Sequence, residues 1–427
     1  MKTKTICALA LCAALSAGPA PAPQLDAPVA LAAEAYTDAS VQYLPLRKRT
    51  RYFADGDQTG ALLRSHWTSI NFIGNVGNFN DIANALAAYS AEEEKSAEAA
   101  RVEMTSEAAH ERKERLADGS PFYGPFERTR DVCVRRADSR VVSLMEFVSS
   151  YTGGVHGMYG VGGVNYDART GKKLALSDVC PSTDGLVAAI IAQLGFDYPD
   201  APFMQSGSTL MQDMVKQMVP DGVVPWTLDP RGVTFYFNPY LIGSYAEGIY
   251  TATILFSEHP GLFAEGYGVG PATYAMEVQP YLVTRLSDSP RDHRLMVSAS
   301  DKELVITFGG LNISDPVAVR DIHPVVVGLD DGRHYLYVDC LQEERGRVIR
   351  VYDLNMAEPA CIGVQPMTLL ASPVDRDDDK EWYVMTDPMD FMATVTEDRG
   401  TPVGAQVRCR VGSDGRIEFI SVENANG

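Results

Sequence analysis

A single histidine lies in the stretch of the sequence that is richest in glycine and tyrosine. Residues 150–179 read SYTGGVHGMYGVGGVNYDARTGKKLALSDV, with His156 between Gly154 and Gly157. An imidazole titrates near neutral pH, so His156 in a flexible loop could act as a general base or as a ligand. Alternatively, it hydrogen-bonds the backbone at a tight strand connection, where glycines permit positive φ and close chain approach. We favour the structural interpretation, because no partner acid or nucleophile is identifiable beside it.

The sequence motifs that usually carry catalysis or metal binding are absent. There is no H-E-x-x-H for zinc, no G-x-x-x-x-G-K-[ST] for phosphate and no G-x-S-x-G nucleophile elbow. Paired carboxylates for glycoside hydrolysis stay open, because such pairs form in space and 56 acidic residues offer many of them. Residues 375–381, DRDDDKE, lack the register of an EF-hand loop and favour a solvated acidic loop over a Ca²⁺ site. We therefore expect no metal, no cofactor and no enzymatic activity.

The charge balance limits the class of partner. The chain has 56 Asp and Glu against 37 Lys and Arg, a formal charge of −19. A surface this negative repels the phosphates of nucleic acid and anionic lipid head groups, so we expect neither as a partner. A cationic partner would instead be attracted.

The N-terminus has the pattern of an export signal. Two lysines precede an apolar run over residues 6–15 that is too short to span a bilayer, and Ala-Leu-Ala at 30–32 fits an A-x-A cleavage site. We expect residues 1–32 to be a signal peptide and the mature chain, without a membrane span, to be periplasmic, secreted or surface-associated. A lipid anchor at Cys12 is the minor alternative, because the leucine before it is large for lipoprotein processing.

Five cysteines follow the expected signal. Because an exported chain meets oxidising conditions, Cys133 with Cys180 and two of Cys340, Cys361 and Cys409 could form disulfides, leaving one free thiol. Their spacing does not reveal the connectivity. None forms a C-x-x-C pair, so metal or redox chemistry is the weaker interpretation.

A long helix is expected near the start of the folded chain. Residues 80–116 are built from Ala, Glu, Lys and Arg without Pro or Gly, and they predict one long helix or a broken pair. Ile82, Leu86 and Tyr89 recur at helical spacing, whereas the later half offers mostly alanine to any neighbour. The acidic run EEEKSAEAA is best interpreted as a solvated face, with partner binding as the alternative.

Strand patterns surround this helix and dominate the rest of the chain. Alternating residues at 233–237 and 250–256 predict two paired strands, preceded by two short helical segments. A polar segment at 285–295 is typical of a linker, and beyond it strand patterns alternate with turn signals such as DDG. We expect an α+β domain over residues 36–285 and a second, antiparallel all-β domain over residues 290–427.

Two longer motifs resemble a known bacterial family. The first resembles Y-x-G-G-A-H-G followed by N-x-D-x-x-T-G-K-x-L-x-L-x-D, and its signature residues here are Tyr151, Gly153, Gly154, His156, Gly157, Asp167, Gly171 and Asp178. The second, FYFNPYLIGSYAEG at residues 235–248, matches an aromatic strand that leads into P-Y-x-I-x-x-Y-A-x-G. Together they resemble the extracellular domain of RsiV-type anti-sigma factors, which also occurs in PdaC-type peptidoglycan deacetylases. The resemblance covers about residues 40–265, so the last domain lies outside it.

The resemblance implies a helix packed on an antiparallel sheet and a binding function. RsiV-like domains capture lysozyme, a small basic enzyme, with loops that enter its substrate cleft. Carried onto this sequence, the contacting loop contains Pro239, Tyr240 and Tyr245, whose rings could act as anchors. The expected function is that of a non-catalytic envelope protein recognising lysozyme or a cell-wall glycan. A cell-wall hydrolase, or an accessory domain of peptidoglycan modification, is the alternative, and sigma-factor control is not carried over.

Overall fold

The computed structural model describes most of the chain after the expected signal. The signal, Cys12, the centre of the expected linker and residues 375–378 of the acidic run lie outside the described residues. The described ranges are 41–58, 60–73, 77–205, 209–286, 294–343, 345–372, 379–398, 401–402 and 404–420.

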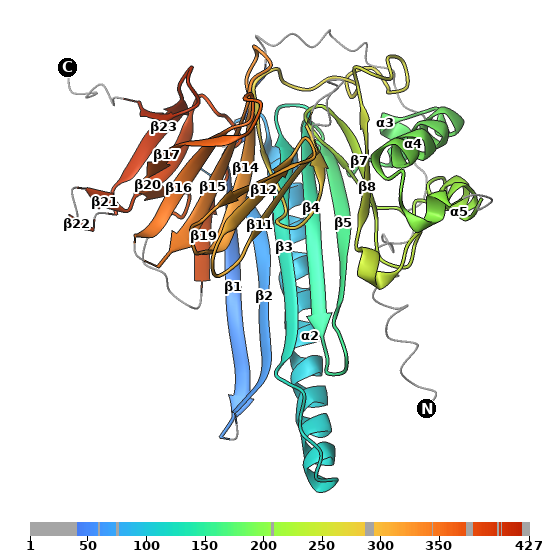
Figure 1. Cartoon of the computed structure of the whole chain (residues 1–427), viewed down its shortest axis with the longest axis vertical. Helices are drawn as coiled ribbons and strands as arrows, with labels where there is room; N and C mark the ends of the chain where they lie inside the picture. The colour runs from blue at the N-terminus through green and yellow to red at the C-terminus, as the bar shows by residue number, and fades with distance from the viewer. Residues whose placement is uncertain are drawn as a thin grey trace.

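A six-stranded sheet in the order β19-β1-β2-β3-β4-β5 forms the centre of the molecule (Figure 1). Its strands are β1 (Leu46–Asp57), β2 (Gly60–Phe72), β3 (Phe126–Ala137), β4 (Val141–Tyr151), β5 (Met158–Asp167) and β19 (Asp379–Tyr383). Neighbours are antiparallel except β2 and β3, which are parallel, so the expectation of a purely antiparallel sheet was wrong at this pair. Parallel neighbours require a crossover, and helix α2 (Asn80–Ala117) between the two strands supplies it.

Helix α2 is a single, unbroken helix of 38 residues that packs on this sheet. Ile82 and Leu86 are fully buried in the sheet's core, as their spacing predicts. The alanine-rich later half buries few side chains, and its Arg101 forms an ion pair with Asp55 of β1. Earlier in the helix, Glu94 of the acidic run pairs with an arginine of the same strand. The acidic run is therefore exposed but not wholly free in solvent, because part of it binds the sheet.

A smaller layer lies beside β5. Three strands, β6 (Trp226–Leu228), β7 (Gly232–Phe237) and β8 (Tyr250–Leu255), form an antiparallel sheet that is covered by helices α3 (Leu176–Val179), α4 (Thr183–Asp197) and α5 (Leu210–Met218). The alternating apolar residues of β7 and β8 fill the shared core, so the predicted strand pair and both predicted helices are confirmed. Between β7 and β8 the chain makes the loop 238–249, which contains the short helix η3 (Tyr245–Glu247).

The C-terminal part is rich in antiparallel strands, as expected, but divides into several sheets. The largest has the order β17-β16-β15-β14-β9, followed by β18-β20-β23-β24, β10-β11-β12-β13 and the pair β21-β22. The bounds are β9 (Tyr274–Glu277), β10 (Thr284–Arg285), β11 (Arg294–Ala299), β12 (Leu304–Phe308), β13 (Leu311–Asp315), β14 (Val319–Gly328), β15 (His334–Gln342), β16 (Gly346–Asp353), β17 (Ala360–Gln365), β18 (Met367–Thr368), β20 (Phe391–Val395), β21 (Glu397–Asp398), β22 (Thr401–Pro402), β23 (Gln406–Val411) and β24 (Ile417–Phe419).

The two parts of the chain exchange strands. Strand β9 precedes the expected linker but pairs with β14, and β19 follows the linker but pairs with β1. A boundary at residues 285–290 therefore does not separate the sheets, and the division into domains 36–285 and 290–427 stays a prediction. Turn composition marks where a chain bends, whereas strand pairing depends on segments more than 300 residues apart, such as Arg47 and Tyr383.

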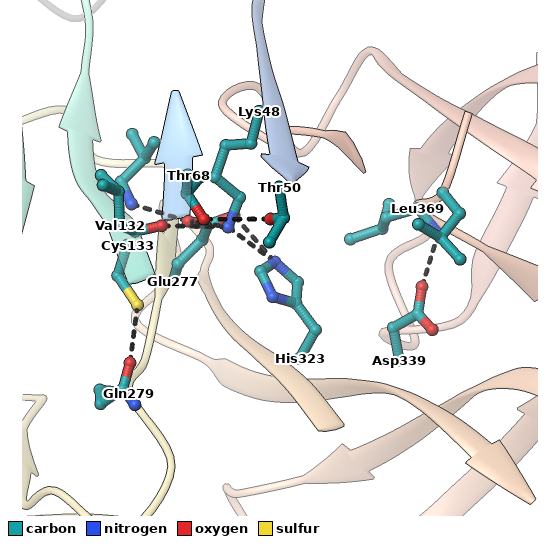
Figure 2. Close-up of polar contacts among 12 residues, drawn as sticks. Lys48, Thr50, Thr68, Val132, Cys133, Glu277, Gln279, His323, Asp339 and Leu369 are labelled. Carbon is teal, nitrogen blue, oxygen red and sulfur yellow. Dashed lines mark hydrogen bonds and ion pairs between the residues drawn. The ribbon is translucent and has the colours of Figure 1, made fainter. Parts of the chain in front are cut away.

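A buried network of charges joins the exchanged strands (Figure 2). The Lys48 ammonium on β1 lies 2.8 Å from the carboxylate of Glu277 on β9, and it also donates to the Val132 carbonyl of β3 at 3.2 Å. His323 Nε2 on β14 contacts the other carboxylate oxygen of Glu277 at 2.8 Å, while the Val134 amide donates to Glu277 at 2.7 Å. Lys48 and Glu277 are 4% and 1% exposed, so this cluster, the junction network, holds ionised groups away from water.

The predicted disulfides are not formed, because the five cysteines lie in different places. Cys133, Cys180, Cys340 and Cys409 are buried in four separate apolar clusters, and Cys361 is exposed on β17. Burial raises the pKa of Cys133 and of Cys340 to about 12, so both thiols stay protonated at neutral pH. They act as small apolar side chains in these cores.

Candidate functional site

The glycine-rich motif forms the turn between β4 and β5, as the structural interpretation predicts. Gly153 and Gly154 adopt φ of 81° and 102°, a backbone region that side chains other than glycine rarely occupy. Gly157 is needed for another reason, since a Cβ there would lie 2.6 Å from the Ser150 carbonyl oxygen. The Tyr151 hydroxyl donates to the Gly154 carbonyl at 3.2 Å and closes the turn.

The remaining signature residues also build turns. One oxygen of Asp167 accepts bonds from the backbone amides of residues 169 and 170, and its other oxygen accepts the Tyr267 hydroxyl at 3.1 Å. Gly171 has a φ of 65°, and a Cβ there would meet the first turn of α2 at 2.5 Å. Asp178 accepts the amide of Ala175 at 2.8 Å at the start of α3. The first motif is thus mainly architectural.

His156 is the exception, because its ring is exposed and touches the second motif. It stacks on Tyr245 with ring centroids 4.1 Å apart, and its Nδ1 contacts the Gly157 carbonyl at 2.8 Å. Tyr245 also meets Tyr159 edge-on at 5.2 Å and Tyr240 at 6.1 Å. We call His156, Tyr159, Tyr240 and Tyr245 the tyrosine cluster. The structure therefore brings together two motifs that the sequence assigned to separate roles.

A buried clamp positions the loop that carries the cluster. The Asn238 side chain accepts the Val161 amide at 2.8 Å and donates to the Val161 carbonyl at 3.0 Å, which fixes the loop to β5. Tyr240 then adopts a φ of 73°, and its side chain remains 58% exposed. Pro239 is buried beside it, so of the three residues expected to bind a ligand, Pro239 does not reach the surface. Tyr245 is half-buried.

Glu247 is the last residue of η3 and supplies a negative charge to the loop. Its carboxylate accepts the Ser244 amide at 2.7 Å and the Tyr250 hydroxyl at 2.8 Å. These hydrogen bonds lower the pKa of Glu247, and the bond from the Ser244 backbone contributes most. Glu247 is therefore ionised at neutral pH. Sequence analysis missed this residue, although Ser244 followed three residues later by Glu247 has the spacing of a capping box.

Two tyrosines of the cluster, Tyr159 and Tyr245, keep neutral hydroxyls at physiological pH. Burial, and then the nearby Tyr240 hydroxyl, raise the pKa of Tyr245 above its ordinary value. The pKa of Tyr159 is raised in the same way, by burial and then by Tyr245. The cluster can therefore offer stacking faces and hydroxyl donors beside one carboxylate, and this suits recognition by contact.

A large cavity adjoins the cluster. Its volume is about 1030 Å³, and Tyr159 and Glu247 belong both to its lining and to the loop region just described. Phe147 of β4 also lines the cavity, and its ring centroid lies 6.2 Å from that of Tyr159. Phe147 was also missed by sequence analysis, because its pattern is that of an ordinary strand residue.

Metal binding and membrane insertion receive no support from the described part of the chain. Within it, no group of three or more His, Cys, Asp or Glu side chains is placed to hold a metal ion. Nor does it contain a helix with the length and apolar character needed to cross a membrane.

Comparison with known proteins detects a domain of unknown function over the part of the site that contains Tyr240 and Tyr245. The family described as "Protein of unknown function (DUF3298)" matches residues 217–257, which include β7, the loop 238–249 and β8. Two solved DUF3298 family proteins are similar to the chain. One from Bacteroides fragilis is 18% identical, covering 52% of this chain and 96% of its own with a TM-score of 0.39. The other, from Pseudomonas aeruginosa, is 20% identical, covering 54% and 98% with a TM-score of 0.32. No curated protein matches the sequence.

Proposed function

We propose that this protein is an exported, non-catalytic binding protein of a bacterial envelope, with an RsiV-like domain whose tyrosine cluster recognises a basic protein such as lysozyme. One observation carries the proposal: His156 stacks on Tyr245 beside the exposed ring of Tyr240, so two sequence motifs form a single aromatic surface. Aromatic rings of this kind are the side chains that dominate binding energy at protein interfaces.

The loop is organised for binding before any partner arrives. The Asn238 clamp and the Glu247 cap hold its two ends, so little conformational entropy remains to be lost on binding. A tyrosine has only two side-chain torsions and therefore adds contact area at low entropic cost. A pre-ordered tyrosine loop is thus suited to enter the cleft of a partner.

Charge supports a basic partner over a neutral one. The formal charge of −19 and the ionised Glu247 beside the rings favour approach of a cationic protein. Such complementarity acts mainly on the association rate and weakens as salt is added. Cell-wall glycan is the second candidate, because sugars also stack on exposed tyrosine rings beside a carboxylate.

Titration calorimetry of the full chain with lysozyme tests the proposal. The variant Tyr240→Ala/Tyr245→Ala should weaken binding by roughly 30-fold or more, the effect of losing an interface anchor. Phe419→Ala is the matched control, since Phe419 is 62% exposed on β24 and should leave affinity unchanged. Equal affinity of both variants would contradict the proposal.

Two further measurements separate the alternatives. Binding of purified peptidoglycan fragments without binding of lysozyme would identify glycan as the ligand of the cluster. Release of reducing sugars or acetate from peptidoglycan by the purified chain would instead establish the hydrolase or deacetylase alternative, and the non-catalytic proposal would then be wrong.

A further inference from the structure

The cavity beside the tyrosine cluster is built by both parts of the chain. From the first part, Tyr159 and Tyr198 line it, and from the C-terminal part, Met296 of β11, Val319 of β14 and Leu341 of β15 do so. Its volume of about 1030 Å³ is at the upper end of the range for pockets that enclose an organic ligand. Most of these lining groups are apolar, so water in the cavity finds few hydrogen-bond partners on its wall. An apolar ligand group would therefore displace this water favourably.

The charged residues of the cavity lining are mostly acidic. Among the described residues of the lining are Glu247 on η3, Asp301 after β11 and Glu343 after β15, and one basic residue, Arg320. The charge of a fourth acid, Asp321, is neutralised by its ion pairs with Arg347 and Lys380. The cavity therefore combines an apolar interior with an excess of negative charge.

Backbone geometry singles out the same region. Three residues other than glycine have positive φ in the described chain: Tyr240 at 73°, Tyr281 at 65° and Asp321 at 50°. Tyr281 and Asp321 line the cavity, and Tyr240 belongs to the adjoining cluster. Strained backbone of this kind persists where the surrounding structure holds it and concentrates at functional sites.

Tyr281 shows how that strain is held. Its amide donates to the Val297 carbonyl at 2.9 Å, and its hydroxyl donates to the Ala299 carbonyl at 2.7 Å. Both partners belong to β11, so the residue is tied at two points to one strand. The residue is nevertheless 64% exposed and lines the cavity.

We propose that this cavity is a second ligand site, which binds a short basic peptide chain. An aromatic or aliphatic side chain of the peptide lies against the apolar wall, and its lysine or arginine lies near Asp301 and Glu343. The same chemistry has two sources, a free peptide or an exposed segment of a bound basic protein. The proposal does not depend on binding at the tyrosine cluster. The cavity shares only Tyr159 with the cluster, together with the neighbouring Glu247, and its other lining residues are distinct.

Fluorescence anisotropy with a labelled peptide tests this site. The probe is a tripeptide amide containing phenylalanine, leucine and lysine, and its counterpart carries glutamate in place of lysine. The full chain should bind the lysine peptide saturably and the glutamate peptide about tenfold or more weakly, because the cavity carries excess negative charge. Equal binding of both peptides, or no saturable binding of either, would overturn the proposal.

Two variants locate the binding. The charge reversal Asp301→Lys/Glu343→Lys should weaken binding of the lysine peptide about tenfold. Glu103→Lys/Glu107→Lys, on exposed positions of α2, makes the same change in net charge and should leave binding unchanged. Equal loss in both variants would show that only overall charge attracts the peptide and would overturn the site.

A third variant tests the cavity itself, and competition identifies the source of the ligand. Ala318→Trp places a large ring in the lining and should abolish peptide binding, with the fold checked by circular dichroism. A folded Ala318→Trp variant with unchanged affinity would contradict the proposal. Displacement of the peptide by lysozyme would identify a protein segment as the ligand, and simultaneous binding would identify a free peptide.

Discussion

The junction network and the tyrosine cluster both combine side chains from distant parts of the chain, but they differ in exposure to solvent. In the network, Lys48 and Glu277 form a buried ion pair beside the half-buried His323, at the point where the two parts exchange strands. In the cluster, His156 and Tyr240 leave aromatic rings in contact with solvent. From this difference we expect the first to stabilise the fold and, under the proposed function, the second to contact a partner.

The two regions should therefore respond to mutation in opposite ways. A buried ion left without its partner is strongly destabilising, because nothing in its surroundings replaces the lost interaction. Exposed rings contribute little to folding, so their loss is felt only when a partner is present.

The largest expected effect follows from breaking the buried pair. Glu277→Leu leaves the Lys48 ammonium buried opposite an apolar side chain, and the free energy of unfolding should fall by about 3–5 kcal/mol. Urea denaturation followed by circular dichroism measures this change. The double variant Lys48→Met/Glu277→Leu should recover much of the loss, because no unpaired charge remains. If single and double variants lose equal stability, the pairing does not govern this junction.

Acid should weaken the same junction. Burial opposes ionisation of Glu277, but Lys48 and His323 outweigh it and lower its pKa from 4.5 to about 2. Because the pKa is lower in the folded state, this stability is fully present above about pH 4.5 and is lost as the pH falls towards 2. It amounts to about 3 kcal/mol at roughly 1.4 kcal/mol per pH unit. Denaturation curves of Glu277→Gln should lack this part of the pH dependence, and an unchanged dependence would refute the assignment.

An intermediate effect is expected at the clamp beneath the tyrosine cluster. Asn238→Ala removes two hydrogen bonds to Val161 and leaves that buried backbone unsatisfied, at a cost of about 1–3 kcal/mol. The same variant should weaken lysozyme binding, because the loop is no longer held in place. Urea denaturation and titration calorimetry of the same variant check both expectations. A loss of stability without a loss of affinity would show that the clamp does not contribute to lysozyme binding.

The smallest effect on folding should come from the exposed ring itself. Tyr240→Gly removes a side chain from a residue with a φ of 73°, so relief of strain offsets the greater freedom of glycine in the unfolded chain. Stability should change by less than about 1 kcal/mol, while affinity for lysozyme falls. A large loss of stability would show that Tyr240 supports the fold, which would remove the contrast between the two regions.

Sequence reasoning succeeded where a pattern is local. The helical segment of α2, the β7–β8 pair and the glycine turn at 152–157 follow from composition, alternation and the conformational needs of Gly153. Whether α2 is one helix or a broken pair was left open by the sequence. Sequence reasoning failed where a residue's surroundings come from elsewhere. Pro239 was expected to meet a ligand, but neighbouring elements bury it, and nothing adjacent to Glu277 in the sequence indicates that Lys48 lies beside it.

The sequence by itself determined the elements and the turns, because helical spacing, strand alternation and glycine's access to positive φ act over a few residues. It also determined the negative charge and supplied the aromatic rings. Only the tertiary structure decided that β9 and β19 change sheets, that Lys48 and Glu277 pair, and that His156 stacks on Tyr245. These outcomes depend on which distant segments pack against one another and become buried together. No local sequence pattern specifies that choice.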